Sequence, residues 1–135
     1  MDKLEALNQN LWTRKMPSVI NLSEKLSLFS ERWTPKVVAS MNNTHFKLAK
    51  IEGDFVWHQH DDSDELFLVL CGEFEMQLRD RSVTLTEGEM IVIPKGVEHR
   101  PCAKQECHVL LAELAGTVNT GNSEGELTAP EEDWI

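Results

Sequence analysis

Short runs of apolar and β-branched residues, separated by residues that favour turns, fill the chain from residue 36 to residue 114. The runs are Lys36–Met41, His45–Ile51, Phe55–His60, Leu66–Leu70, Phe74–Arg79, Ser82–Leu85, Met90–Ile93 and His108–Leu114. Turn-forming sequences such as Asn42-Asn43, Glu52-Gly53-Asp54 and Pro94-Lys95-Gly96 lie between them. Because regularly spaced short strands with few helices pack as sandwiches or barrels, the sequence predicts a single all-β domain.

The residues before the strands predict an N-terminal extension, 1–34, that packs on the β domain or on a partner subunit. Leu4, Leu7 and Leu11 recur at helical spacing, and Met16 offers an alternative start. Residues 21–33 are expected to form a short helix, because Asn21 or Ser23 can cap it and its apolar residues share one side. Those apolar residues are Leu26, Phe29 and Trp33.

The β domain itself is expected to span residues 35–115, and residues 116–135 are expected to form an acidic, loop-like C-terminal tail. The 135 residues carry a formal net charge of −10. Nucleic acids and anionic membrane surfaces are therefore disfavoured as partners, since both attract basic patches. The sequence shows no apolar run long enough to span a membrane and no signal-peptide core. Three cysteines without CxxC spacing suit a reducing cytoplasm, which is the predicted location.

His58, His60, Glu65 and His99 form the most specific chemical pattern in the chain. Residues two apart on a strand project from one face, so His58 and His60 can hold a single ion. Three imidazoles and one carboxylate suit iron, manganese, nickel or zinc, whereas closed structural zinc sites are usually rich in cysteine. We therefore predict that these four residues bind one divalent metal ion.

The same residues fall in two separated motifs that resemble those of the cupin superfamily. The first reads Gly53, four residues, His58-Gln59-His60, four residues, Glu65, six residues, Gly72; the second reads Gly88, five residues, Pro94-Lys95-Gly96, two residues, His99. The resemblance implies a jelly-roll β-barrel, with His58, His60, Glu65 and His99 as metal ligands. The chain departs from the family pattern in two places. Four residues rather than the usual five separate Gly53 from His58, and Ala103 stands where an asparagine is often found after the second motif.

The residues around the predicted metal are expected to form a pocket with an apolar wall. From Glu65, strand alternation places Phe67 inward unless the register slips by one residue, and Met76 belongs to an alternating strand. His45 and Lys47 share one face of an early strand. They either reach the cavity or lie on an exposed face, and the sequence leaves both possibilities open.

These observations favour a divalent-metal-dependent enzyme, of oxygenase or isomerase type, that acts on a small organic molecule. The alternative is a non-catalytic cupin that binds or senses a small molecule through the metal. No general base can be assigned from the sequence. The acidic run Asp61-Asp62-Ser63-Asp64 is expected to disfavour polyanionic substrates. A homodimer, which would cover exposed sheet edges, is the expected assembly.

Overall fold

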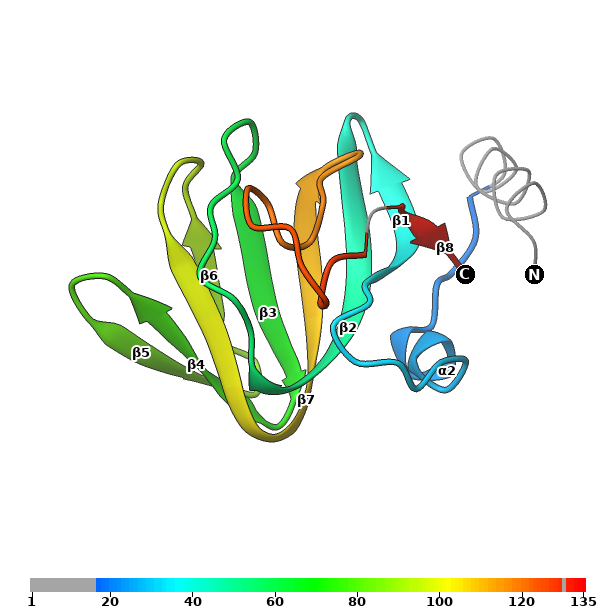
Figure 1. Cartoon of the computed structure of the whole chain (residues 1–135). Helices are drawn as coiled ribbons and strands as arrows, with labels where there is room; N and C mark the ends of the chain where they lie inside the picture. The colour runs from blue at the N-terminus through cyan, green and yellow to red at the C-terminus, as the bar shows by residue number, and fades with distance from the viewer. Residues whose placement is uncertain (1–16, 130) are drawn as a thin grey trace.

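Eight strands and one short helix make up the part of the chain that the computed structural model describes, residues 17–129 and 131–135 (Figure 1). In chain order they are α2 (Leu22–Leu26), β1 (Lys36–Met41), β2 (Thr44–Asp54), β3 (Glu65–Cys71), β4 (Glu73–Leu78), β5 (Ser82–Thr86), β6 (Met90–Ile93), β7 (His99–Leu114) and β8 (Asp133–Trp134). The predictions for Leu4, Leu7, Leu11 and Met16 lie outside the described residues. The predicted all-β jelly-roll class is confirmed.

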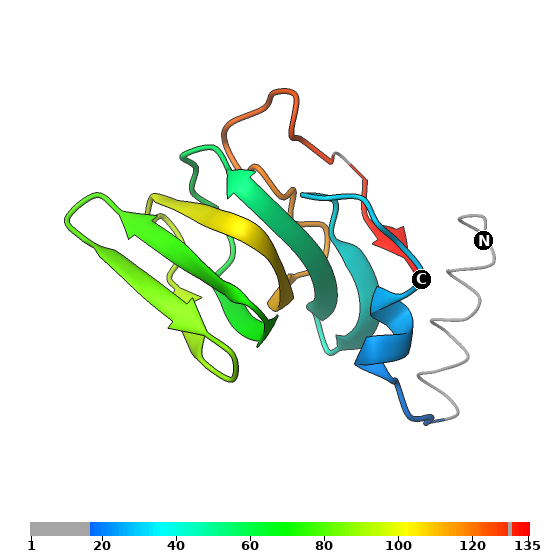
Figure 2. The ribbon, with the colours of Figure 1, turned by 90° about the horizontal axis from the view of Figure 1, so that it is seen from below.

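Strand β7 organises the sheet, because it pairs with β2 on one edge and with both β4 and β3 on the other. Its first residues pair with β4, from Leu78↔His99 to Glu75↔Cys102, and its last residues pair with β3. The sheet bends along β7, so that β4 and β5 lie on one side and β1 and β2 on the other (Figures 1 and 2). The strand path runs β5-β4-β7-β2-β1-β8 and stays open between its ends, so the predicted closed barrel is better described as an open jelly-roll sandwich.

A glycine turn allows β3 and β4 to follow one another along the same edge of β7. Gly72, between the two strands, has a φ of 86°, a conformation that side chains other than glycine rarely adopt. A Cβ atom there would also lie only 3.2 Å from the backbone oxygen of Glu106, on the bend of β7. The turn and the bend are thus packed against each other.

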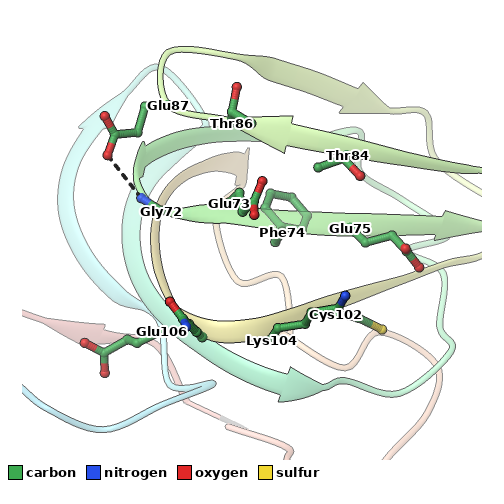
Figure 3. Close-up of a pocket in the computed structure, with 11 residues that line it drawn as sticks. Gly72, Glu73, Phe74, Glu75, Thr84, Thr86, Glu87, Cys102, Lys104 and Glu106 are labelled. Atoms are coloured by element: carbon green, nitrogen blue, oxygen red, sulfur yellow. Dashed lines mark hydrogen bonds between the residues drawn. The ribbon is translucent and has the colours of Figure 1, made fainter.

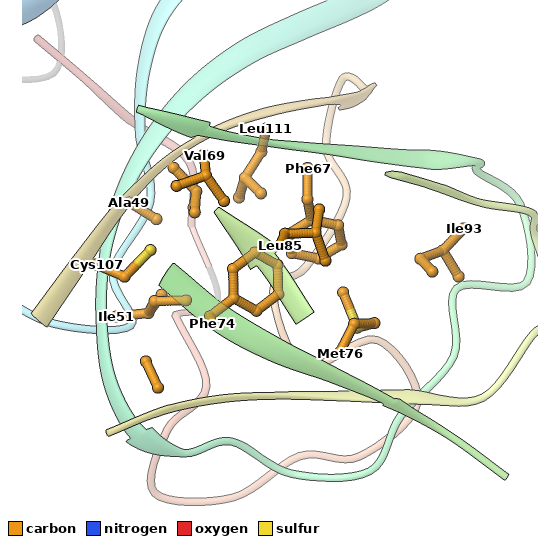
Figure 4. Packing of buried hydrophobic residues seen from close by; sticks show 12 residues of the cluster. Ala49, Ile51, Phe67, Val69, Phe74, Met76, Leu85, Ile93, Cys107 and Leu111 are labelled. Carbon is orange, nitrogen blue, oxygen red and sulfur yellow. The ribbon is translucent and has the colours of Figure 1, made fainter. Parts of the chain in front are cut away.

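The hydrophobic core fills the inner side of the bent sheet (Figure 4). Phe67 and Val69 of β3 point into it, whereas Leu66 and Leu68 are half-buried, so the predicted register of this strand is confirmed. Met76 is fully buried in the same cluster.

Two predicted elements differ from the structure. Residues 55–60 form no strand; they contribute only an isolated bridge between His58 and His99. Pairing stops there because the backbone of the next residue, Gln59, bonds to Asn122 of the C-terminal segment instead of a strand. Conversely, β7 begins at His99, nine residues before the predicted start at His108.

The predicted helix over residues 21–33 is shorter than expected. Asn21 caps it, its side chain accepting a hydrogen bond from the Glu24 N–H at 2.9 Å, but the helix ends at Leu26. Trp33 has a φ of 59° and cannot continue a right-handed helix. Its ring instead stacks on Phe55 with centroids 4.5 Å apart.

The C-terminal tail is attached to the sheet. Its strand β8, which the sequence analysis did not predict, pairs in parallel with β1 through Lys36↔Asp133 and Val37↔Trp134. None of the helices in the described part of the chain is both long and apolar enough to cross a membrane. Exposed apolar residues include Met90 and Val92 of β6, but the homodimer stays a prediction.

Candidate metal centre

Four side chains from three places in the fold converge at one end of the bent sheet. His58 and His60 lie on the extended segment before β3, Glu65 is the first residue of β3, and His99 is the first residue of β7. All four are buried, and one ligand atom from each lies within 4.8 Å of the others. The structure therefore brings together the four residues that the sequence singled out.

Hydrogen bonds to the backbone orient two of the three imidazoles. His58 Nδ1 lies 2.9 Å from the Val56 carbonyl oxygen, and His99 Nδ1 lies 2.9 Å from the Val97 carbonyl oxygen. A carbonyl can only accept, so both Nδ1 atoms carry a proton, and a neutral ring held in this way presents the lone pair of its Nε2 atom. Metal-binding histidines are commonly held in this way.

The ligand atoms converge on the carboxylate. Glu65 Oε1 lies 3.2 Å from His99 Nε2 and 3.3 Å from His60 Nε2. These contacts are favourable with a proton on Nε2 or with a cation bound between the nitrogen and the carboxylate oxygen. Among the described residues, His60 Nε2 is buried and has no partner with hydrogen-bond geometry. A divalent cation would satisfy all of these atoms, and the imidazole and carboxylate set fits iron, manganese, nickel or zinc.

The charge states of the cluster suit a metal as well. Burial, together with the neighbouring His99, lowers the pKa of His58 to about 4, so its ring is neutral at pH 7. Burial alone would raise the pKa of Glu65, but hydrogen bonds with Glu113, His60 and His99 hold it well below its ordinary value. A neutral imidazole and an ionised carboxylate are the forms that bind metals.

Glu113, near the end of β7, is a buried acidic residue beside the cluster that the sequence analysis missed. Strand pairing places it beside Glu65, and both residues line one small cavity. Lys47 donates a hydrogen bond to Glu113 Oε1 at 2.8 Å. Burial and the proximity of Glu65 raise the pKa of Glu113 well above its ordinary value, although Lys47 acts in the opposite direction. The signal was present in the sequence, because alternation from the inward-facing Val109 and Leu111 places residue 113 inward.

The predicted pocket residues occupy three different settings. Phe67 lines a cavity beside the cluster, whereas Met76 belongs to the core and does not line it. Lys47 is buried behind Glu113, where it also approaches Glu132 at 3.1 Å. His45 Nδ1 lies 2.7 Å from Glu132 Oε2. Lys47 and His45 thus belong to a charged network that reaches the cluster through Glu113.

The cavity beside the cluster is small and mostly apolar. Its volume is about 30 Å³, enough for one or two water molecules, and its polar lining comes from His58, Glu65, Glu113 and Asn119. A second hollow of about 320 Å³ lies on the other side, between His60, the acidic loop 61–63 and the C-terminal segment.

A larger hollow of about 790 Å³ lies over β4, β5 and the bend of β7 (Figure 3). It is lined by Glu73, Glu75, Glu87, Glu106, Lys104 and Cys102, among others, and by none of the four clustered residues. Size alone does not make it the reactive site, because the convergent imidazoles are elsewhere.

The C-terminal segment supports the histidine pair from outside the sheet. Gly121 packs so closely that a Cβ atom would lie 2.2 Å from the Gln59 carbonyl oxygen. The Ser123 hydroxyl donates to the Trp57 carbonyl oxygen at 2.9 Å. Residues on both sides of His58 are thereby held by the segment that the sequence predicted to be an acidic, loop-like tail.

Comparisons with known proteins agree with this fold. Residues 44–112, just over half of the chain, match the model of a family described as the cupin domain. A cupin-2 domain containing protein from Shewanella frigidimarina is 53% identical, with a TM-score of 0.70 over 71% of this chain and 94% of that one. Protein NMB1881 from Neisseria meningitidis is 36% identical, with a TM-score of 0.67 over 73% of this chain and 100% of that one.

A curated relative shares only part of its length with this chain. It is the uncharacterized protein YdbB of Bacillus subtilis, 39% identical over 64 residues, which are 47% of this chain and 57% of YdbB. The matched region of the cupin domain model ends at residue 112, so the C-terminal segment that supports the histidines lies beyond it.

Proposed function

The chain belongs to the cupin family, and we propose that it binds one divalent metal ion and uses it to transform a small organic molecule, as an enzyme of oxygenase or isomerase type. His58, His60, Glu65 and His99 would hold the ion. The observation that carries this proposal is the convergence of three imidazoles and one carboxylate, whose ligand atoms lie within 4.8 Å of one another, with the buried His60 Nε2 left without a hydrogen-bond partner among the described residues. A shared cation would satisfy this buried set of nitrogen and oxygen atoms.

Four protein ligands leave open positions on an ion that prefers six, and a bound metal would supply Lewis-acid or redox chemistry there. The chain's own residues shape the approach to it. Phe67 and the stacked pair Trp33 and Phe55 make one side apolar. Glu113 lies beside the carboxylate ligand Glu65 and lines the same cavity.

The volumes of the two hollows favour a small substrate. The 30 Å³ cavity can accept only a water molecule or a group of a few atoms. The 320 Å³ hollow beside His60 has room for a larger part of a small molecule, and Asp61 and Asp62 line it. Their charges disfavour phosphorylated substrates, so we propose a small neutral molecule or one with little negative charge.

The second candidate is a non-catalytic cupin that binds or senses a small molecule through the same metal. The small volume of the inner cavity favours this candidate, since it leaves little space for a substrate to rearrange beside the cluster. Both candidate functions need the bound metal, but only the enzyme would convert its ligand into a product.

The test is the metal content of untagged protein, followed by oxygen uptake of the iron-loaded form with a panel of small thiols, diols and keto acids. About one metal ion per chain with substrate-dependent oxygen uptake would support an oxygenase. Metal without oxygen uptake, together with thermal stabilisation by a panel compound, would favour an isomerase or a binding protein. Protein that stays free of metal after incubation with each candidate ion would contradict the proposal.

A further inference from the structure

A row of charged side chains crosses the inner face of the sheet from the candidate metal centre to the C-terminal segment. In the register of β3 and β7, Leu66 pairs with Ala112, so the preceding Glu65 faces Glu113. In the register of β2 and β7, Glu113 pairs with His45, and Lys47 lies two residues further along β2. Strand pairing therefore places the carboxylate of the candidate ligand next to a second carboxyl group.

Two acidic residues side by side within a sheet are destabilising unless something compensates them. Glu65 and Glu113 are both only 3% exposed, so water does not screen them. Lys47 is also 3% exposed and donates to Glu113 Oε1, and Glu132 holds Lys47 from the other side at 3.1 Å. The buried Lys47 thus holds the Glu113 carboxyl group in place.

The second oxygen of Glu113 is available for a role at the site. Among the described residues, no donor reaches Oε2, although this atom is buried. Glu113 lies opposite Glu65 in the pairing of β3 and β7 and lines the cavity that Glu65 and His58 also line. Glu113 is not one of the four residues whose ligand atoms converge. Its effect on a bound metal therefore passes through its neighbour Glu65.

We propose that Glu113 is a positioning residue of the metal centre: held by Lys47, it places a polar group beside Glu65 and orients the carboxylate whose Oε1 faces His60 and His99. This inference rests on the proposed metal site and extends it beyond the four ligands. Residues that orient ligands in this way affect metal affinity by roughly 10- to 100-fold.

The experiment measures Co²⁺ affinity by chelator competition and records the visible spectrum of the Co²⁺-loaded full chain. Glu113→Leu should bind Co²⁺ roughly 10- to 100-fold more weakly than the wild type, with a changed spectrum, because Glu65 loses the polar neighbour that orients it. Glu113→Gln should restore most of the affinity, since an amide can still donate to Glu65 and accept from Lys47. The matched control is Glu106→Leu, an exposed glutamate on the same strand, which should bind Co²⁺ as the wild type does.

Glu113→Leu leaves Lys47 without one of its partners and can unfold for that reason alone. The double variant Lys47→Met/Glu113→Leu removes both charges together, and such replacements are often tolerated. If it folds and binds Co²⁺ as weakly as predicted for Glu113→Leu, the inference is supported. Wild-type affinity in a folded variant lacking Glu113, or a Glu113→Gln variant as weak as Glu113→Leu, would overturn it.

The wild-type titration separates this inference from the proposed function. A wild-type chain that binds no Co²⁺ would overturn the metal site and, with it, the role of Glu113. A wild-type chain that binds Co²⁺ no better than Glu113→Leu would keep the metal site and overturn only the positioning role.

Discussion

Asn122 and Gln59 exchange two hydrogen bonds, which join the C-terminal segment to the residue between the two clustered histidines. The Gln59 N–H donates to Asn122 Oδ1 at 3.0 Å, and the Asn122 N–H donates to the Gln59 carbonyl oxygen at 3.2 Å. Since Gln59 lies outside any strand, these bonds replace the sheet pairing that would otherwise hold His58 and His60 in place.

Replacement of Asn122 should therefore loosen the metal centre. Asn122→Ala removes one of the two bonds, and the expected cost is about 0.5–1.5 kcal/mol in the free energy of unfolding, together with weaker metal binding. Urea unfolding and a metal titration measure the two effects. Asn122→Asp keeps the accepting oxygen and should retain most of the metal affinity; equal losses in both variants would contradict this explanation.

Gly121 should tolerate no side chain. Its φ is 54°, and an added Cβ atom would lie 2.2 Å from the Gln59 carbonyl oxygen and 3.2 Å from His60 Nδ1. Gly121→Ala is expected to destabilise the fold by at least about 1–2 kcal/mol from backbone strain alone, and to weaken metal binding because the clash displaces the histidine segment.

The control for Gly121→Ala is Gly125→Ala, in the same segment. A Cβ atom at Gly125 would meet nothing within 4 Å, so this variant should unfold at the wild-type urea concentration or slightly above it. Similar midpoints for the two alanine variants would mean that the C-terminal segment does not press on Gln59.

The four clustered residues were predictable from the sequence because residue type and spacing carried the information. His58, His60, Glu65 and His99 sit at short, fixed intervals within two motifs, and local spacing survives whatever the exact strand boundaries are. The strands with clear alternation, such as Leu66–Leu70, were also found with the correct face inward.

The rest depended on long-range pairing, which a single sequence does not reveal. The Phe55–His60 run has strand-like composition, yet its neighbour in space is the C-terminal segment more than 60 positions away. Glu113 and Lys47 meet only through the registers of β2 and β7. The helix after Asn21 ends at Leu26, earlier than its apolar pattern suggested, and Trp33 packs on the distant Phe55.

Met76 was expected in the pocket but is fully buried in the core, away from the residues that line the small cavity. Met76→Ala should therefore lower the free energy of unfolding by about 2–5 kcal/mol and leave metal affinity unchanged. Urea unfolding and a metal titration test both expectations. A variant of normal stability with altered ligand or metal binding would instead place Met76 at the site.

His99 is the ligand contributed by β7, so its loss should weaken metal binding while most of the sheet remains intact. His99→Ala is expected to bind metal too weakly for stoichiometric recovery, because one of the four donors is gone and Glu65 loses a neighbour at 3.2 Å. Metal analysis, with circular dichroism as the folding check, gives the answer. His108→Ala, a histidine on the same strand outside the cluster, is the control. A folded His99→Ala protein with a full metal complement would exclude the four-ligand centre.

The stability of the metal-free protein should depend on the protonation of His58. Its pKa falls from 6.5 to about 4 on folding, chiefly because of burial, so between these values the unfolded chain binds a proton that the folded chain does not. Stability is therefore unaffected by this group above about pH 6.5 and decreases as the pH falls from 6.5 towards 4, by up to about 3 kcal/mol.

Urea unfolding of the metal-free protein at several pH values between 4 and 7 tests this dependence on His58. The slope of stability against pH should be smaller in His58→Gln, which cannot take up the proton, whereas His108→Gln should keep the wild-type slope. An unchanged slope in a folded His58→Gln variant would assign the acid sensitivity to other groups. Bound metal should steepen the wild-type loss, because protons then compete with the ion for the imidazole nitrogens.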